Sequence, residues 1–260
     1  MSPLNSSIAI VTGVGREKGI GTAVCRALAA AGVDIFFTYW SAYDRSMPFY
    51  DRDTDDGWPE KLKEQVQNYG VRCASLELDL SKKDAPEKLL DVVEERLGSP
   101  AILINNATYS IDAGFKSMNA AILDAHYEVN VRGTLLLTTA FARRIEGRHG
   151  GRVIHMVSGQ DQSPEPGNLA YVSTKGAVSA FTKSAAIELA PLNITVNAVD
   201  PGPTNTGWMT ETLKDELKPR FPMGRIGEPE DAARLICFLA GEDSGWVTGQ
   251  IIHSDGGFLS

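Results

Sequence analysis

Residues Ile8 to Gly21 have the sequence IAIVTGVGREKGIG, and this stretch decides the fold. The first part, IAIVT, is typical of a short buried strand, and a run of glycines follows it. An apolar helix face is predicted from Ile20 onward, and a second strand is predicted at 33–39. A strand, a glycine-rich turn, a helix and a strand form a βαβ unit, so we expect the free N–H groups at the amino end of the helix to bind a pyrophosphate. A merely tight turn is the alternative.

The same alternation continues along the chain. Further strands are predicted at 71–78, 101–105, 152–157, 194–199 and 250–253, and further helices at 62–69, 81–97, 119–147, 170–190 and 228–240. Seven strands alternating with helices predict an α/β fold built on a doubly wound parallel sheet, with helices on both faces. Because no repeat, low-complexity tract or linker divides the chain, we expect a single domain over residues 1–260.

A second informative stretch runs from Ser158 to Lys175 and reads SGQDQSPEPGNLAYVSTK. Ser158 follows the predicted strand 152–157, and a loop rich in Gly and Pro comes next. Tyr171 and Lys175 lie four residues apart near the start of a helix, so both project from one face. The ammonium is expected to lower the pKa of the phenol, so that Tyr171 exchanges a proton with a substrate oxygen held by Ser158. An ordinary Tyr and Lys on an amphipathic helix remain the alternative on this pattern alone.

The composition argues against several classes of protein. A formal net charge of −8 argues against non-specific nucleic-acid binding and provides no attraction to anionic membranes. The three cysteines are far apart and form no C-x-x-C motif, which suits a reducing compartment. Without a leader or an apolar run of membrane length, we expect a cytoplasmic protein, and we expect no metal.

The choice of cofactor is predicted from the end of the second strand, where NAD-binding proteins usually carry an acid for the ribose 2′-hydroxyl. Residues 38–41 read TYWS, and the first acid is Asp44. Arg16 and Lys18 in the glycine turn favour the 2′-phosphate of NADP(H), while NAD(H) stays open because Asp44 could turn back. The acidic, aromatic loop 42–60 is predicted to be a solvated excursion, with a flap over the adenosine or a subunit contact as alternatives.

Ordered landmarks along essentially the whole chain resemble those of the short-chain dehydrogenase/reductase family, whose members have a Rossmann-type fold. The landmarks are Thr12-Gly13…Gly19-Ile20-Gly21, Asp79-Leu80, Asn105-Asn106-Ala107, Asn130, Ser158, Tyr171-x-x-x-Lys175 and Pro201-Gly202. The resemblance implies that Tyr171 is the general acid/base and that Ser158 orients the substrate oxygen. It also implies that Lys175 lowers the pKa of Tyr171 and holds the nicotinamide ribose.

The resemblance further implies a set of cofactor contacts. The glycine turn would hold the phosphates, and its residues are Gly13, Lys18, Gly19, Ile20 and Gly21. Asp79 with Leu80 would meet the adenine, and Asn106 and Ala107 would line the groove. Pro201 and Gly202 would begin a substrate lid, and Thr206 would approach the nicotinamide amide. Asn130 would support a proton-relay water, and a bond from its side chain to nearby backbone is the alternative.

Two departures from the family pattern are visible. Two extra residues lie between Gly13 and Gly19, so the phosphate turn must bulge. Thr108 stands where the family usually has the glycine of Asn-Asn-Ala-Gly, which would reshape the groove beside the nicotinamide. Neither departure removes a catalytic group.

We therefore predict an NADP(H)-preferring oxidoreductase that moves a hydride between nicotinamide and a substrate carbonyl or alcohol. The runs 225–231 and 248–257 resemble those of 3-oxoacyl-[acyl-carrier-protein] reductases, so a 3-oxoacyl thioester is our first substrate hypothesis. The alternatives are an NAD-dependent alcohol or sugar dehydrogenase and a non-catalytic dinucleotide-binding protein.

Partners follow from the same hypothesis. An acidic carrier protein would need a basic dock, for which the candidates are Arg143, Arg144, Arg148 and Arg152, and a solvated helix end is the alternative. The resemblance implies a homotetramer or homodimer that associates through helices 119–147 and 170–190. We expect no nucleic-acid or membrane partner.

Overall fold

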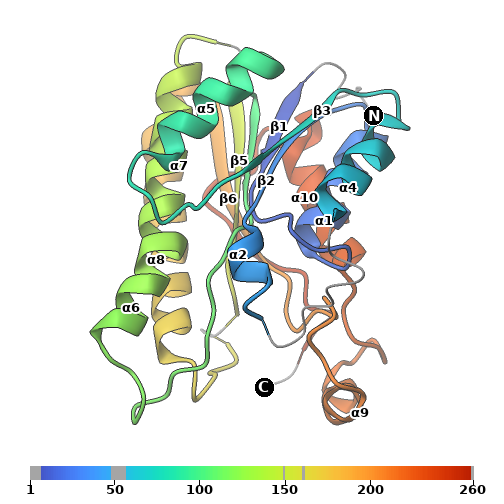
Figure 1. The fold of residues 1–260 in the computed structure, drawn as a ribbon, viewed down its shortest axis with the longest axis vertical. Helices are drawn as coiled ribbons and strands as arrows, with labels where there is room; N and C mark the ends of the chain where they lie inside the picture. The colour runs from blue at the N-terminus through green and yellow to red at the C-terminus, as the bar shows by residue number, and fades with distance from the viewer. Residues whose placement is uncertain (1–6, 48–56, 149, 160–161, 259–260) are drawn as a thin grey trace.

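The computed structural model describes residues 7–47, 57–148, 150–159 and 162–258. Its centre is a seven-stranded sheet in the order β3-β2-β1-β4-β5-β6-β7 (Figure 1). The strands are β1 Ile8–Val11, β2 Asp34–Tyr39, β3 Cys73–Glu77, β4 Ile102–Asn105, β5 Gly151–Met156, β6 Ile194–Asp200 and β7 Ile251–His253. Every neighbouring pair is parallel, so the predicted doubly wound parallel sheet is confirmed.

Helices connect the strands, as the sequence pattern predicts. They are α1 Ile20–Ala30, α2 Ser41–Asp44, α4 Trp58–Gln67, α5 Ala85–Arg96, α6 Ala120–His126, α7 Thr134–Ile145, α8 Leu169–Leu189, α9 Glu211–Leu217 and α10 Pro229–Ala240. Short turns of helix lie at Ala190–Leu192, Lys218–Arg220 and Glu242–Ser244, and a π-helix occupies Tyr127–Gly133. A capping box between Glu228 and Asp231 begins α10, where Pro229 is the first helical residue.

Two apolar layers cover the sheet (Figure 1). Helices α1, α4 and α10 pack on one face, where Ala9 and Val11 of β1 meet Val24, Leu28 and Ile236. Helices α5, α7 and α8 pack on the other face, with side chains such as Ile8 and Ile10 among the strand residues beneath them. Alternate residues of β1 therefore enter opposite cores, as the pleat of a strand requires. Burial on both faces explains why the central strand β1 is apolar throughout.

The strand order places the candidate site. Strand β1 pairs with β2 on one side and with β4 on the other, so the connections run in opposite directions from β1 and β4. Crevices at the carboxyl ends of such strands are where open α/β sheets bind ligands. The glycine turn after β1, the Asn-Asn-Ala turn after β4 and Ser158 after β5 all lie at this edge.

Two segments differ from the predictions. The helix predicted at 119–147 is confirmed in outline, but its middle is the π-helix that contains Asn130. The loop predicted as a solvated excursion at 42–60 is only partly solvated where it is described, because Tyr43 lies in α2 with a half-buried side chain and Trp58 is 1% exposed at the start of α4. Its other described residues include exposed ones, such as Arg45 and Glu60. Residues 48–56 lie outside the described residues.

Within the described ranges, none of the helices combines the length and the apolar character needed to cross a bilayer.

Candidate active site

The three predicted catalytic side chains meet at the carboxyl edge of the sheet. Ser158 follows β5 after one residue, and its hydroxyl is hydrogen-bonded to Tyr171 in the first turn of α8. Lys175, one turn further, places its Nζ 5.6 Å from the centroid of the Tyr171 ring and donates to the backbone carbonyl of Met156 at 2.8 Å. The fold thus brings together one hydroxyl, one phenol and one ammonium from β5 and α8.

Burial controls the protonation of this group. Burial raises the pKa of Tyr171, the hydrogen bond from Ser158 opposes that effect, and the nearby Glu165 and Asp200 carboxylates add to it. Burial also lowers the pKa of Lys175 to about 8. The expected lowering of the Tyr171 pKa by Lys175 is therefore not what the free protein shows, because desolvation of the phenol dominates. At neutral pH Tyr171 is protonated and can act as an acid.

Asn130 has no side-chain capacity left for a water. Its Oδ1 accepts from the amide of Tyr109 at 2.7 Å and from Thr108 Oγ1 at 3.2 Å. Its Nδ2 donates to the Tyr109 carbonyl at 2.9 Å and to Thr174 Oγ1 at 3.0 Å. The bond to nearby backbone, which the sequence left open, is present. Asn130 holds the segment after β4 against α8, so any relay water would have to use backbone atoms.

The turns after β1 and β4 are joined by direct hydrogen bonds. Thr12 Oγ1 accepts from the amides of Asn106 and Ala107, both at 3.0 Å. Asn106 Nδ2 donates to the carbonyls of Thr12 at 2.8 Å and Gly13 at 2.9 Å. Gly13 has a φ of +73°, and a Cβ on it would come within 2.5 Å of the Ala107 Cα. Only glycine allows this approach, and the Asn106 side chain fixes the turn instead of facing the groove.

The amino end of α1 fits a dinucleotide phosphate. Gly19 is its N-cap residue and provides no side-chain cap, so the first-turn amides of Ile20, Gly21 and Thr22 have no side-chain acceptor. The predicted bulge is closed by bonds from Gly19 N and Thr22 Oγ1 to the Arg16 carbonyl, at 3.2 and 2.7 Å. Because the N-cap residue is a glycine and no side chain caps the helix, an anion can approach the free N–H groups at the start of α1.

The other predicted cofactor residues lie along the same edge. Asp79 accepts from the amide of Ser81 at 2.9 Å and pairs with Lys82 at 3.4 Å, and the Leu80 side chain is in the core. Residues Pro201, Gly202 and Thr206 follow β6, where Gly202 has a φ of +59° and Trp208 Nε1 donates to the Thr204 carbonyl. The methylene chain of Lys18 lies near Gly207, so this cation points towards the segment after β6.

The structure argues against the basic cluster as a carrier-protein dock, because two of its four arginines are engaged within the fold. Arg144 binds Glu87, Asp91 and Glu94 of α5 at 2.7 to 2.9 Å, and Arg143 pairs with Glu87. Arg152 is partly buried and donates to the Gly241 carbonyl. These residues lie at the amino end of β5, and Ser158 lies beyond its carboxyl end. The charges of Arg144 and Arg152 are therefore used within the fold, and the cluster lies at the edge of the sheet opposite Ser158.

Comparison with known proteins gives the family. A family model described as Enoyl-(Acyl carrier protein) reductase matches residues 13–259. The oxidoreductase YjdA of Bacillus subtilis is 48% identical, with 100% of this chain and 99% of the relative covered. A 3-oxoacyl-[acyl-carrier-protein] reductase FabG of Aquifex aeolicus is 32% identical, with 98% of each covered.

Solved structures agree with this result. The structure of a short-chain dehydrogenase/reductase from Serratia marcescens has a TM-score of 0.85 at 30% identity, with 99% of this chain and 100% of that chain covered. The chain belongs to the short-chain dehydrogenase/reductase family. A blue fluorescent protein from a metagenomic library, solved in complex with NADPH, has a TM-score of 0.87 at 28% identity over 99% and 100% of the two chains.

Within this short-chain dehydrogenase/reductase, residues that the sequence analysis did not assign also reach the groove. Tyr43 Oη accepts from the amide of Ser110 at 3.2 Å, and its ring lies 5.4 Å from that of Tyr109. Asp44 pairs with Arg16 at 3.8 Å and lies directly against Gly15, so it does turn back towards the glycines. Helix α2 therefore spans from the glycine turn to the segment after β4. The sequence signal that could have identified α2 was the aromatic residues next to residues 38–41, from which the NADP preference was predicted.

Proposed function

We propose that this short-chain dehydrogenase/reductase is an NADP(H)-preferring oxidoreductase that interconverts a substrate carbonyl and alcohol, with 3-oxoacyl thioesters as the first substrate class. The observation that carries the proposal is the hydrogen-bonded Ser158 and Tyr171 pair, with Lys175 behind it, at the same sheet edge as the uncapped start of α1. The dinucleotide would lie between these two features. A bound nicotinamide supplies or accepts the hydride.

The protein supplies the proton. Ser158 would donate to the carbonyl oxygen of the substrate and orient it towards Tyr171. Because its raised pKa keeps Tyr171 protonated, the phenol can protonate that oxygen as hydride arrives at the carbon. Lys175, with a pKa of about 8, is charged at neutral pH and stabilises the phenolate that remains. The arrangement favours reduction at neutral pH and oxidation at higher pH.

NADP(H) preference is supported by the absence of an acid at residues 38–41, at the end of β2, and by the cation Arg16 in the glycine turn, whereas Lys18 points away towards the segment after β6. The related structure solved with NADPH adds support by similarity. One observation favours the second candidate, an NAD-dependent alcohol or sugar dehydrogenase: the Asp44 carboxylate lies against Gly15 and pairs with Arg16. Fluorescence titration of the protein with NADPH and with NADH decides between them. We expect tighter binding of NADPH, and tighter binding of NADH would favour the second candidate.

Turnover is tested with purified protein, NADPH and a panel of carbonyl compounds, followed by the loss of cofactor absorbance. The panel should contain acetoacetyl-CoA as the soluble 3-oxoacyl thioester, together with simple ketones, aldehydes and keto sugars. We expect oxidation of NADPH that depends on the carbonyl compound and is fastest with the thioester. Cofactor binding without turnover of any compound would leave the third candidate, a non-catalytic dinucleotide-binding protein.

We also propose that the chain, residues 1–260, is one domain that acts as a cytoplasmic homo-oligomer. Support comes from apolar side chains left exposed on the two helical segments expected to mediate contact; they are Leu123, Tyr127, Leu136 and Ile187. Burying such exposed apolar groups against a second copy would stabilise an interface. Light scattering coupled to gel filtration would give the mass directly, and a monomer at micromolar concentration would contradict the proposal.

A further inference from the structure

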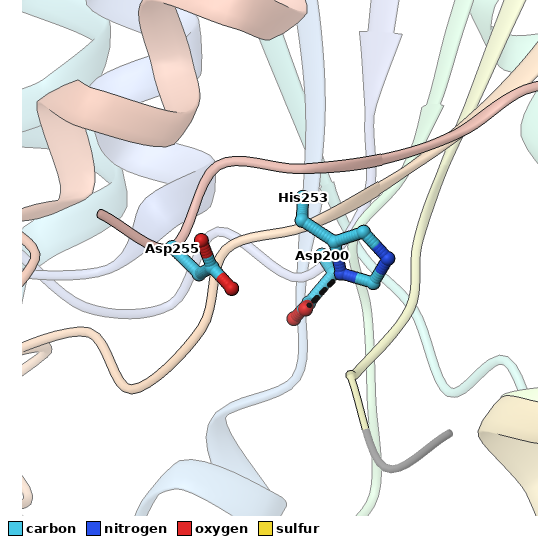
Figure 2. Close-up of side chains that lie close together, drawn as sticks. All are labelled: Asp200, His253 and Asp255. Carbon is cyan, nitrogen blue, oxygen red and sulfur yellow. Dashed lines mark hydrogen bonds and ion pairs between the residues drawn. The ribbon is translucent and has the colours of Figure 1, made fainter. Parts of the chain in front are cut away.

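A chain of hydrogen bonds links the ends of β6 and β7 to the loop that carries Ser158. His253, the last residue of β7, pairs with Asp200, the last residue of β6, with 2.8 Å between Nδ1 and Oδ2 (Figure 2). The other ring nitrogen, Nε2, lies 2.8 Å from Nε2 of Gln162. Gln162 belongs to the segment that begins at Ser158 and precedes α8, and we call its described residues, 158–159 and 162–168, the Ser158 loop. We infer that Asp200, His253 and Gln162 position this loop for catalysis.

The bonds define one form of the imidazole. Asp200 Oδ2 is an acceptor, so His253 carries its proton on Nδ1 and donates it. Nε2 then has a free lone pair, which accepts from the Gln162 amide. Both bonds are satisfied by a neutral histidine. The ionisable groups beside the ring are Asp200 and Asp255 at the ends of the two neighbouring strands, and Asp200 also acts on Tyr171.

Asp200 is itself fixed and touches the loop directly. Its side chain is 4% exposed, and its Oδ1 accepts from the amide of Gly202 at 2.9 Å. A Cβ on Gly159 would come within 2.3 Å of Asp200 Oδ2, so the carboxylate lies against the residue that follows Ser158. The loop is therefore held at Gly159 by contact and at Gln162 through His253. Gly159 is next to Ser158 in the chain and Gln162 follows it by one turn, so holding both residues fixes the direction of the Ser158 hydroxyl.

The same cluster has the chemistry of a metal site, but its atoms are already engaged. Asp200, His253 and Asp255 offer ligand atoms within 4.8 Å of one another (Figure 2). Both oxygens of Asp200 and both nitrogens of His253 take part in hydrogen bonds, and Asp255 Oδ1 accepts from the amide of Gly257 at 2.9 Å. Positioning by hydrogen bonds accounts for the whole arrangement without an ion. His253 is accordingly a positioning residue and contacts no reacting atom.

The first test, which rests on the proposed function, is the His253→Ala variant. A small displacement of a catalytic group costs up to about a hundredfold in rate, so we expect kcat to fall about tenfold to a hundredfold while the Kd for NADPH stays the same. Added imidazole should fill the space and restore part of kcat. The Asp255→Asn variant is the matched control and should keep wild-type kcat. An unchanged kcat in His253→Ala would overturn the inference, as would equal loss in Asp255→Asn or a loss of wild-type activity in EDTA.

A second variant avoids any risk to folding, because Gln162 is exposed. In Gln162→Leu the side chain keeps a similar size but has no N–H group to donate to Nε2 of His253, so the loop loses this bond. We expect kcat to fall several-fold while the Kd for NADPH stays the same. A kcat equal to that of wild type would contradict the role assigned to Gln162 and His253.

Hydrogen exchange separates this inference from the proposed function. The amides of Gln162 and Ser163 both donate to the Gly159 carbonyl, at 2.9 and 2.8 Å, and report on the order of the loop. In His253→Ala they should exchange at least tenfold faster, while the amides of β5 stay protected. This holds even if no tested carbonyl compound is reduced. Turnover without faster exchange would reject the anchor and leave the proposed function standing.

Discussion

Lys175 is a catalytic residue whose ionisation changes with folding in a way that can be measured without a substrate. Burial lowers its pKa from 10.5 to about 8, which corresponds to about 3 kcal/mol of differential stability between the two protonation states. Between these pH values the unfolded chain holds a proton that the folded chain has lost, so the free energy of unfolding rises with pH. The buried ammonium of Lys175 therefore destabilises the folded chain at neutral pH. The same positive charge is what would stabilise the phenolate of Tyr171.

The Lys175→Met variant tests this linkage. It removes the buried charge and loses the bond to the Met156 carbonyl, worth about 1 kcal/mol, so we expect it to be more stable than wild type by about 2 kcal/mol at neutral pH. The advantage should shrink as the pH rises from 8 towards 10, because the folded wild-type protein then loses the buried charge while its unfolded chain keeps the proton. Urea unfolding at several pH values measures it. A difference that stays constant with pH would show that Lys175 keeps an ordinary pKa in the folded chain.

Tyr43 is the residue through which α2 acts on the groove. The bond between Tyr43 Oη and Ser110 joins α2 to the segment after β4. We expect a dinucleotide that extends from the start of α1 to Tyr171 to cross this bond, which would then open before the cofactor enters or leaves. Tyr43→Phe should therefore raise the association and dissociation rates several-fold, as expected from losing about 1 kcal/mol, with a smaller effect on Kd. Stopped-flow fluorescence measures both rates, and wild-type values for both would contradict a gating role for α2.

The end of α7 behaves as a structural element. Arg144 crosses to α5 and binds three carboxylates there, at the end of the sheet opposite Ser158. Arg144→Ala should lower the free energy of unfolding by about 1 kcal/mol, the size expected for partly exposed ion pairs, and should leave the KM for a thioester substrate unchanged. Chemical denaturation and steady-state kinetics check the two statements. A raised KM with unchanged stability would restore the carrier-protein dock.

The elements show what sequence patterns can and cannot predict. Tyr171, Lys175 and Ser158 were predictable because helical spacing and the end of one strand bring them together locally. Asp200 and His253 were not predicted, although both end adjacent parallel strands, because their contact depends on the sheet order. The role of Asn130 depends on its hydrogen bonds to the backbone of Tyr109, and residue spacing in the sequence does not predict that contact. Tyr171 stays protonated because burial raises its pKa, and the extent of that burial could not be predicted from the sequence.

The sheet as a whole determines where association can occur. Leu136 and Leu137 are neighbours in α7, but Leu136 is 41% exposed and Leu137 is fully buried under the sheet. If the exposed face of α7 joins two subunits, Leu136→Lys should reduce the mass in solution while each subunit keeps its fold. Leu137→Ala should instead lower the free energy of unfolding by about 3 kcal/mol. Light scattering and denaturation of the two variants separate association from core packing, and an unchanged mass for Leu136→Lys would place the interface elsewhere.

The central claim is that Tyr171 transfers a proton to or from a substrate oxygen beside a bound nicotinamide. The most direct measurement is the rate of carbonyl-dependent NADPH oxidation by Tyr171→Phe, with the exposed Tyr69→Phe variant as control. We predict that kcat falls at least a hundredfold in Tyr171→Phe, as loss of a general acid implies, while the Kd for NADPH and the rate of Tyr69→Phe stay at wild-type values. Turnover by Tyr171→Phe at the wild-type rate would contradict the account.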